Sequence, residues 1–249
     1  MKTIDKEEQN KAESRLDDGD FLSIDKPLGW TSFDVVAKIR NAYKQAGLKR
    51  KVGHCGTLDP QATGLLILAT GRKTREIATL EVLDKVYDGV IKLGVVTESH
   101  DSETPEYDHC STAHLTEERI REAASGLVGI HQQQPPMHSA AWHNGKRLYQ
   151  HARKGEVIQE RKAKEIIIYR FDITRIELPM VHFILHVSKG AYVRVIAYDL
   201  GRALGVGGYL ASLRRVAIGA WQLGASQTIS DTIKAIFQQA SNKFPVDGR

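Results

Sequence analysis

Hydrophobic and polar residues follow two kinds of pattern along the chain, and the first of them predicts strands. In the segment 85–96, Tyr87, Gly89, Ile91, Leu93 and Val95 alternate with other residues and fall on one face. Further strands are expected at 19–24, 64–70, 165–169, 171–178 and 181–187, with an element of undefined type at 209–218.

The second pattern has helical spacing. After the N-capping pair Thr31-Ser32, apolar residues recur at positions 35, 36, 39 and 43, and Gly47 ends the predicted helix. Other helices are expected at 73–82, 116–127, 196–204 and 230–239, with Ser230 as the last N-cap, and a short one ends at Gly155. The acidic segment 97–110 is predicted to be a surface loop and 131–142 to be irregular.

The order of these elements shows no steady βαβ repeat, which favours an α+β fold with a central mixed, largely antiparallel sheet flanked by helices. Residues 1–19 lack apolar periodicity and are expected to form a flexible arm before one domain at 20–249. No apolar run approaches the roughly 20 residues that span a bilayer, and the polar start has no secretory signal.

Composition excludes only a few classes of protein. The 249 residues are 41% hydrophobic and 26% charged, as in ordinary globular proteins. The two cysteines, Cys55 and Cys110, form no CxxC pair, which fits a reducing, cytoplasmic compartment. The net charge of +5 permits nucleic-acid binding, and short basic clusters interleaved with aromatic residues suit phosphate contacts and base stacking.

The stretch 51–64 (KVGHCGTLDPQATG) is the strongest candidate site. Gly53 and Gly56 let another backbone or a ligand come close, and Pro60 drives Asp59 toward an extended conformation that aims its carboxylate. A tight turn in which Asp59 only caps the backbone is the alternative for such a loop considered alone.

Other chemistries have weaker support. The segment Gly71–Thr74 lacks the upstream glycine of a phosphate-binding loop. One acidic stretch carries possible metal ligands without zinc spacing: His100, Asp101, His109, Cys110 and His114. His54 and Cys55 are neighbours whose side chains point apart, so a Cys-His nucleophile is not expected. We expect neither a metal nor a cofactor.

The string GHCGTLDP around Asp59 closely resembles the motif around the nucleophilic aspartate of the TruB family of tRNA pseudouridine synthases. The similarity extends along almost the whole chain, through the segments DKPLGWTS at 25–32, KVY at 85–87, PPM at 135–137 to Gly155, SKGAYVR at 188–194 and LRR at 213–215. His138 and Trp142 depart from the family pattern, which usually has tyrosine and lysine there.

This resemblance implies the pseudouridine synthase fold, with an active-site cleft across the sheet, and isomerisation of the uridine at position 55 in the T-loop of tRNA. Asp59 would be the nucleophile or base, Arg194 its ionic partner and Tyr87 the residue stacked on the base. The expected pocket residues are Lys26, His54, Gly56 and Leu213. The expected RNA-backbone contacts are Arg50, Lys51, Arg147, Arg153 and Arg214.

The resemblance also implies tRNA, through its T-stem-loop, as the partner of a monomer that needs no guide RNA and no membrane. Because the sequence stops soon after its last predicted helix, we expect no C-terminal PUA domain of the kind that many relatives carry. Two alternatives stay open: a catalytically silent tRNA-binding or tRNA-folding module on the same scaffold, and an Asp-dependent nucleoside hydrolase. The sequence does not decide between nucleophile and base for Asp59.

Overall fold

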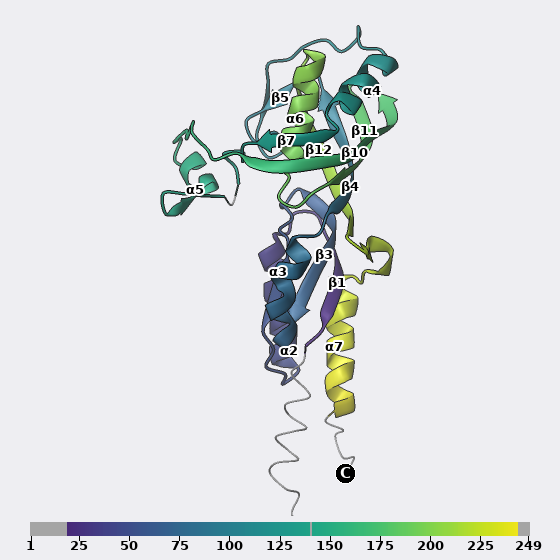
Figure 1. Cartoon of the computed structure of the whole chain (residues 1–249). Helices are drawn as coiled ribbons and strands as arrows, with labels where there is room; N and C mark the ends of the chain where they lie inside the picture. The colour runs from purple at the N-terminus through teal and green to yellow at the C-terminus, as the bar shows by residue number, and fades with distance from the viewer. Residues whose placement is uncertain (1–18, 140, 244–249) are drawn as a thin grey trace, which may run out of the picture. The chain divides into compact units, whose positions relative to one another are not determined.

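A computed structural model describes residues 19–139 and 141–243 of the chain (Figure 1). These residues fall into two compact units. Unit 1 contains the described residues up to Leu83 together with those from Arg215 onward, and unit 2 runs from Asp84 to Arg214. The expected arm falls almost entirely on residues 1–18, which lie outside the described ones.

Unit 1 is built around strand β3 (Ala62–Thr70), which is buried almost throughout because its sequence is a continuous apolar run. Strand β1 (Phe21–Lys26) and strand β2 (Val52–Cys55) both pair with it in antiparallel register. Helices α2 (Ser32–Gln45) and α7 (Ile229–Lys243) pack against each other. The short helix α3 (Ile77–Glu81) follows the 3₁₀ turn η1 (Gly71–Glu76) and packs against β2.

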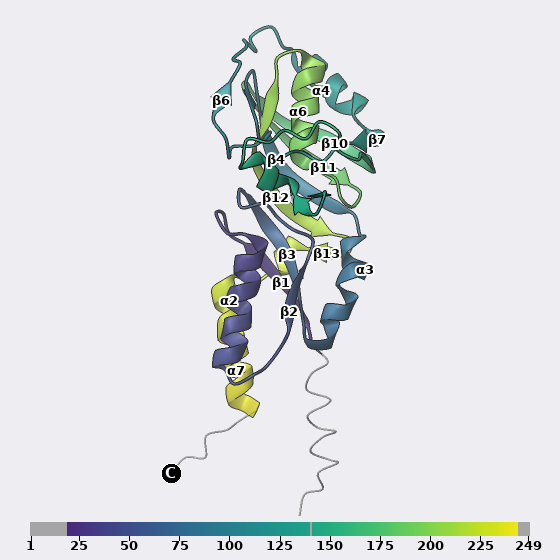
Figure 2. The ribbon, with the colours of Figure 1, turned by 90° about the vertical axis from the view of Figure 1, so that its left-hand side faces the viewer.

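Unit 2 contains four antiparallel strands in the order β4 (Lys85–Leu93), β11 (Met180–Val187), β10 (Lys164–Glu177) and β7 (Gly129–Gln133). Helix α4 (Glu117–Gly126) packs against β10 and against α6 (Val193–Leu204), and Figure 2 shows the two helices side by side. Strand β12 (Gly208–Ile218) begins in unit 2 and ends in unit 1, where it pairs with β13 (Trp221–Gln222).

Two smaller hairpins complete unit 2. Strand β5 (Val96–Thr97) pairs with β6 (Glu106–Tyr107). Strand β8 (Trp142–His143) pairs with β9 (Lys146–Arg147), which leads directly into helix α5 (Leu148–Ala152). The remaining element is a 3₁₀ turn, η2 (Leu223–Ala225), in unit 1.

The expected α+β class with a largely antiparallel sheet is confirmed, and Thr31 caps α2 as predicted. The alternation at 85–93 also holds, since Tyr87, Gly89 and Ile91 are all buried. Strand β4 ends at Leu93 rather than at 96, because Gly94 takes a φ of +80° that a strand cannot continue. None of the described helices is long and apolar enough to cross a membrane.

Several boundaries were wrong for identifiable reasons. The strands expected at 165–169 and 171–178 are one strand, β10, whose pairing with β11 shifts register after Ile168 and after Ile173. The segment 131–142 is not irregular throughout, because residues 131–133 belong to β7 and pair with β10. Pairing partners distant in sequence decide both cases.

Helix ends also differ. The helix predicted at 73–82 is mostly the 3₁₀ turn η1, and only 77–81 is α-helical. Helix α7 begins at Ile229, and Thr228 rather than Ser230 caps it, because its hydroxyl oxygen accepts the Asp231 amide at 3.1 Å. Helix α6 begins at Val193, three residues earlier than predicted, so Arg194 lies in its first turn.

Candidate active site

In unit 1, Asp59 is half-buried in the loop between β2 and β3. The loop turns at Gly56, whose φ of +81° is a left-handed conformation that favours glycine. It closes where the Ala62 amide donates to the Asp59 carbonyl at 3.0 Å, and the Gly29 amide donates to the Pro60 carbonyl at 2.9 Å. The backbone on both sides of the carboxylate is therefore fixed by hydrogen bonds.

The buried hydroxyl of Ser32, at the start of α2, fixes the residue before Asp59. Its oxygen accepts the Leu58 amide at 2.8 Å and donates to the Leu58 carbonyl at 3.1 Å. Leu58 itself is only 3% exposed. Both polar groups of this buried peptide unit thus depend on one side chain from the segment 25–32.

Arg215, at the end of β12, holds the other side of the same loop. Its guanidinium is 1% exposed and donates to the carbonyls of Leu65 at 2.7 Å, Gly56 at 3.1 Å and Thr57 at 3.5 Å. Sequence reasoning placed this arginine only in a basic cluster at the end of the active-site wall. The signal for it was weak, because a second arginine beside Arg214 reads equally well as an RNA contact.

Lys26 is the second buried cation of this region. Its ammonium group donates to the carbonyls of Trp30 at 2.6 Å and Pro27 at 3.0 Å, and the residue is fully buried. Burial lowers the pKa of Lys26 to about 8, while the nearby negative charge of Asp59 opposes this shift and the charge of Arg215 adds to it. Lys26, Asp59 and Arg215 therefore lie within electrostatic reach of one another.

His54, on β2, lies opposite Leu68 of β3. Burial lowers the pKa of its imidazole, the carboxylate of Glu81 opposes this, and Arg215 lowers the pKa further. Its Nδ1 is buried without a hydrogen-bond partner among the described residues. A neutral ring suits contact with a nucleobase more than with a phosphate.

In unit 2, Tyr87 lies on β4 opposite Leu185 of β11 and is 7% exposed. Arg194 is 4% exposed and forms a salt bridge with the equally buried Asp101, with 3.4 Å between Nη1 and Oδ2. Its guanidinium also donates to the carbonyls of His138 at 3.0 Å and Ser99 at 3.3 Å. Arg194 is thus held by a carboxylate that sequence reasoning did not assign to it.

Asp101 is in turn fixed by donors of its own loop. Its Oδ1 accepts the Ser99 hydroxyl at 2.5 Å and the Glu103 amide at 2.9 Å. The prediction that 97–110 is a surface loop was therefore wrong for Thr97, Ser99 and Asp101, all of which are buried. A carboxylate that pairs with a buried arginine is drawn inside, whatever the hydrophilicity of its segment.

The residues expected to contact RNA are distributed over both units. Arg50 in unit 1 forms a salt bridge with Asp20 at 2.8 Å and lies over the Tyr43 ring, and Lys51 is exposed. In unit 2, Arg147 lies over the exposed Trp142 ring at 4.2 Å. The remaining expected RNA contacts in unit 2 are the exposed Arg153 and the half-buried Arg214, and the expected pocket residue Leu213 is also half-buried.

Each unit thus assembles part of the predicted site. Unit 1 brings together Lys26, Asp59 and Arg215. It also holds His54, on β2, and Gly56, in the loop that carries Asp59. Unit 2 holds Tyr87 and Arg194. The pairing of Asp59 with Arg194 and the stacking role of Tyr87 remain predictions.

Comparisons with known proteins agree with the motifs. Residues 41–193 match the model of the N-terminal domain of the TruB family of pseudouridylate synthases. The chain is 65% identical, over 94% of its length and 92% of the relative's, to tRNA pseudouridine synthase B of Chlorobium chlorochromatii. It is 60% identical to the protein of that name from Chlorobaculum tepidum, over 94% of this chain and 98% of the relative's.

Solved structures show the same fold. A chain of the archaeal box H/ACA sRNP Nop10-Cbf5 complex superposes with a TM-score of 0.66 at 25% identity, over 94% of this chain and 58% of that one. A chain of a Cbf5-Nop10-Gar1 complex gives a TM-score of 0.69 at 25% identity, over 92% and 60%. The chain therefore spans less than two thirds of the length of these structural neighbours.

Proposed function

The chain belongs to the TruB family of pseudouridylate synthases, and from this membership we propose that it isomerises uridine to pseudouridine in tRNA. The substrate we propose is the uridine at position 55, presented by the T-stem-loop. The protein would act as a cytoplasmic monomer without cofactor or guide RNA. The observation that carries the proposal is the loop that presents Asp59 close to two buried cations, Lys26 and Arg215.

The reaction breaks the bond between N1 of uracil and C1′ of ribose, turns the detached base, and joins its C5 to C1′. Asp59 acts at the ribose, as nucleophile on C1′ or as base for an elimination. In both routes the carboxylate has to be ionised to react at the ribose. C5 loses its proton last and N1 of the uracil gains one, so the composition is unchanged and the overall change is an isomerisation.

The other two proposed roles belong to unit 2. Tyr87 would support the flat uracil ring while it turns, and could accept the C5 proton. Arg194 would pair with Asp59, and its salt bridge with Asp101 would fix the direction of its guanidinium. Extrusion of the base from its stack costs on the order of a few kcal/mol, which contacts from His54 and the basic residues would offset.

The test is incubation of the purified protein with an unmodified T-stem-loop RNA, followed by carbodiimide treatment and primer extension. We expect a stop that maps to the target uridine, and its loss in Asp59→Asn while the RNA still binds. Asp172→Asn, the same change at a half-buried carboxylate of β10 that pairs with Arg170, is the matched control and should keep the activity.

The outcomes separate the alternatives. Binding without any pseudouridine would indicate a silent tRNA-binding module. Release of free uracil would indicate a nucleoside hydrolase. Appreciable turnover by Asp59→Asn would remove the proposed role of this carboxylate.

A further inference from the structure

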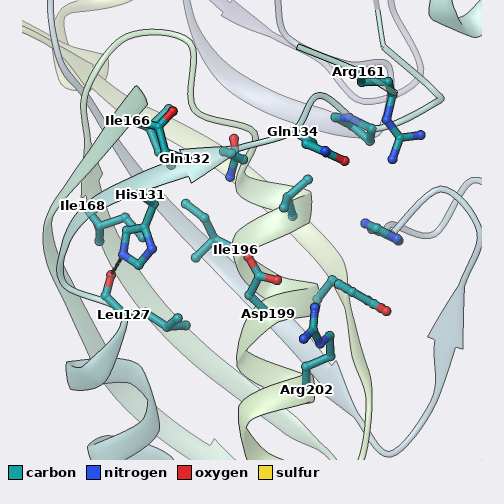
Figure 3. A pocket seen from close by; sticks show the side chains of 15 residues that line it. Leu127, His131, Gln132, Gln134, Arg161, Ile166, Ile168, Ile196, Asp199 and Arg202 are labelled. Carbon is teal, nitrogen blue, oxygen red and sulfur yellow. Dashed lines mark hydrogen bonds between the residues drawn. The ribbon is translucent and has the colours of Figure 1, made fainter. Parts of the chain in front are cut away.

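Unit 2 contains a cavity of about 450 Å³ whose lining residues have no role in the proposed reaction. Most of the lining comes from β7 and the residues that follow it, from β10, and from α6 (Figure 3). Its volume lies in the range of small-molecule sites, roughly 300 to 1,000 Å³. The arrangement of apolar and ionic groups around it is specific enough to indicate a ligand.

One wall of the cavity is apolar. Ile166 and Ile168 of β10 and Ile196 of α6 are each about 2% exposed. Figure 3 shows these three side chains around the inner part of the cavity, with Asp199 and Arg202 below them. Flat, rigid aliphatic surfaces of this kind suit the face of a planar ring.

Three ionic side chains line the cavity, and the guanidinium of one of them, Arg202, lies over the Tyr198 ring at 6.0 Å from its centroid. Among the residues that the structure describes, the side chains of Arg161, Asp199 and Arg202 form no hydrogen bond or salt bridge. Nε of Arg161 is buried and has no hydrogen-bond partner among the described residues. Burial raises the pKa of the half-buried Asp199, against the opposing charges of Arg202 and His131. The buried Nε of Arg161 and the half-buried Asp199 are costly to leave in this way unless a ligand supplies the missing hydrogen bonds, and Arg202 is exposed and accessible to a ligand.

The rim of the cavity holds a strained residue. His100 has a φ of +60°, which is rare outside glycine, and its ring stacks on Tyr198 with centroids 4.2 Å apart. Burial and the charge of Arg194 lower the pKa of His100 to about 4, so the ring is neutral at pH 7. The unpaired charges at the cavity are therefore two arginines against one aspartate, which favours a ligand with an anionic group.

We propose that this cavity binds a guanine nucleotide, with the base over the isoleucine wall, its donor edge at Asp199 and its phosphate at Arg161 and Arg202. Guanine alone among the four common bases offers two adjacent donors, N1–H and the 2-amino group, to a single carboxylate. Adenine and cytosine pair one donor with an acceptor, and uracil has one donor between two acceptors. A zwitterionic amino acid would satisfy the charges but leave the apolar wall uncovered.

The test is titration calorimetry of the full chain at pH 8 with GMP, AMP, CMP and UMP, in the absence of RNA. GMP should bind at least tenfold more tightly than the other three nucleotides. Asp199→Asn should reduce the preference for GMP over AMP to less than twofold. Arg161→Gln combined with Arg202→Gln should weaken all four nucleotides at least tenfold, whereas Arg119→Gln, an exposed arginine on α4, should change nothing.

A second arm identifies the source of the nucleotide. The pentamers UUGUU and UUAUU are compared by fluorescence anisotropy, and tighter binding of UUGUU than of GMP points to guanosine within RNA, whereas the reverse points to a free nucleotide. Either result supports the site provided that the tighter binding is lost in Asp199→Asn. An unchanged melting temperature of this variant is the folding control. Equal affinity for all four nucleotides, an unaffected Asp199→Asn variant, or tighter binding of free glutamate than of GMP would overturn the assignment. Because no tRNA is present, such a failure leaves the isomerase proposal unaffected.

Discussion

The hydroxyl of Ser32 offers a sharp test of how the Asp59 loop is held. Ser32→Ala removes one oxygen atom and with it the two hydrogen bonds to the Leu58 peptide unit, at 2.8 Å and 3.1 Å. Leu58 is 3% exposed, so its amide and carbonyl have no ready access to water. Each buried polar group left unsatisfied costs about 1 to 3 kcal/mol.

The two groups together give an expected loss of about 2 to 4 kcal/mol in the free energy of unfolding of unit 1, since partial relaxation offsets part of the sum. Domains are commonly stable by about 5 to 15 kcal/mol, so the variant should still fold. The residue next to Leu58 is Asp59, and a loop that loses this anchor no longer holds its carboxylate in one orientation. We therefore expect the single-turnover rate on tRNA to fall at least tenfold, with tRNA affinity within twofold of the wild type.

The assay combines amide hydrogen exchange at Leu58 with single-turnover kinetics. Exchange of this amide should accelerate at least tenfold in Ser32→Ala, because its acceptor is gone. Ser125→Ala, the same chemical change at an exposed position of α4, is the control and should alter neither measurement. Unchanged protection of the Leu58 amide would show that the hydroxyl does not anchor the loop.

Three further predictions concern the buried charges of the site. Arg215→Met removes donors to two loop carbonyls and one carbonyl of β3, so we expect the denaturation midpoint to fall and turnover to drop more than a hundredfold. An unaltered midpoint in urea would refute the anchoring role. Asp101→Asn removes the salt bridge between Asp101 and Arg194, so kcat should fall at least tenfold with KM within twofold; a change confined to KM would speak against a positioning role. Lys26 has a pKa of about 8 in the folded chain against its usual 10.5, so the unfolded state holds the extra proton between these values. The stability of the wild type relative to Lys26→Met should therefore rise from pH 8 to pH 10 in denaturation curves, and a fall over that range would contradict the assignment.

Local patterns in the sequence predicted much of the fold. The helical spacing after Thr31 and the alternation from residue 85 both reflect burial of one face, and both elements were found where expected. The continuous strand β10 was not predictable, because its register shifts depend on pairing with β11. The true cap of α7 was missed for a simpler reason: Thr228 and Ser230 are both good caps, and only the path of the backbone decides between them.

For the candidate site, too, the sequence predicted one part and missed another. The residues of the Asp59 loop stand close together in sequence, and a motif identifies them. The partners that hold them do not: Ser32 precedes Leu58 by 26 positions, and Arg215 follows Gly56 by 159. Nothing in the residue types distinguishes Arg215 from an RNA-binding arginine, and nothing marks Asp101 as the buried partner of Arg194 rather than as one of several acidic loop residues. Burial separates these readings, and burial is a property of the folded chain.

The two buried cations of unit 1 explain why a motif so far from the Asp59 loop accompanies it. Among the described residues, Lys26 and Arg215 bond only to backbone carbonyls, so their positive charges are not cancelled by a carboxylate in contact with them. Removing such charges from water costs several kcal/mol each. That cost is offset where an anion lies within reach, and Asp59 acts on Lys26 in this sense. The lysine of the first motif thus acts on the carboxylate and the arginine of the last on the backbone of the same loop, which ties both ends of unit 1 to that loop.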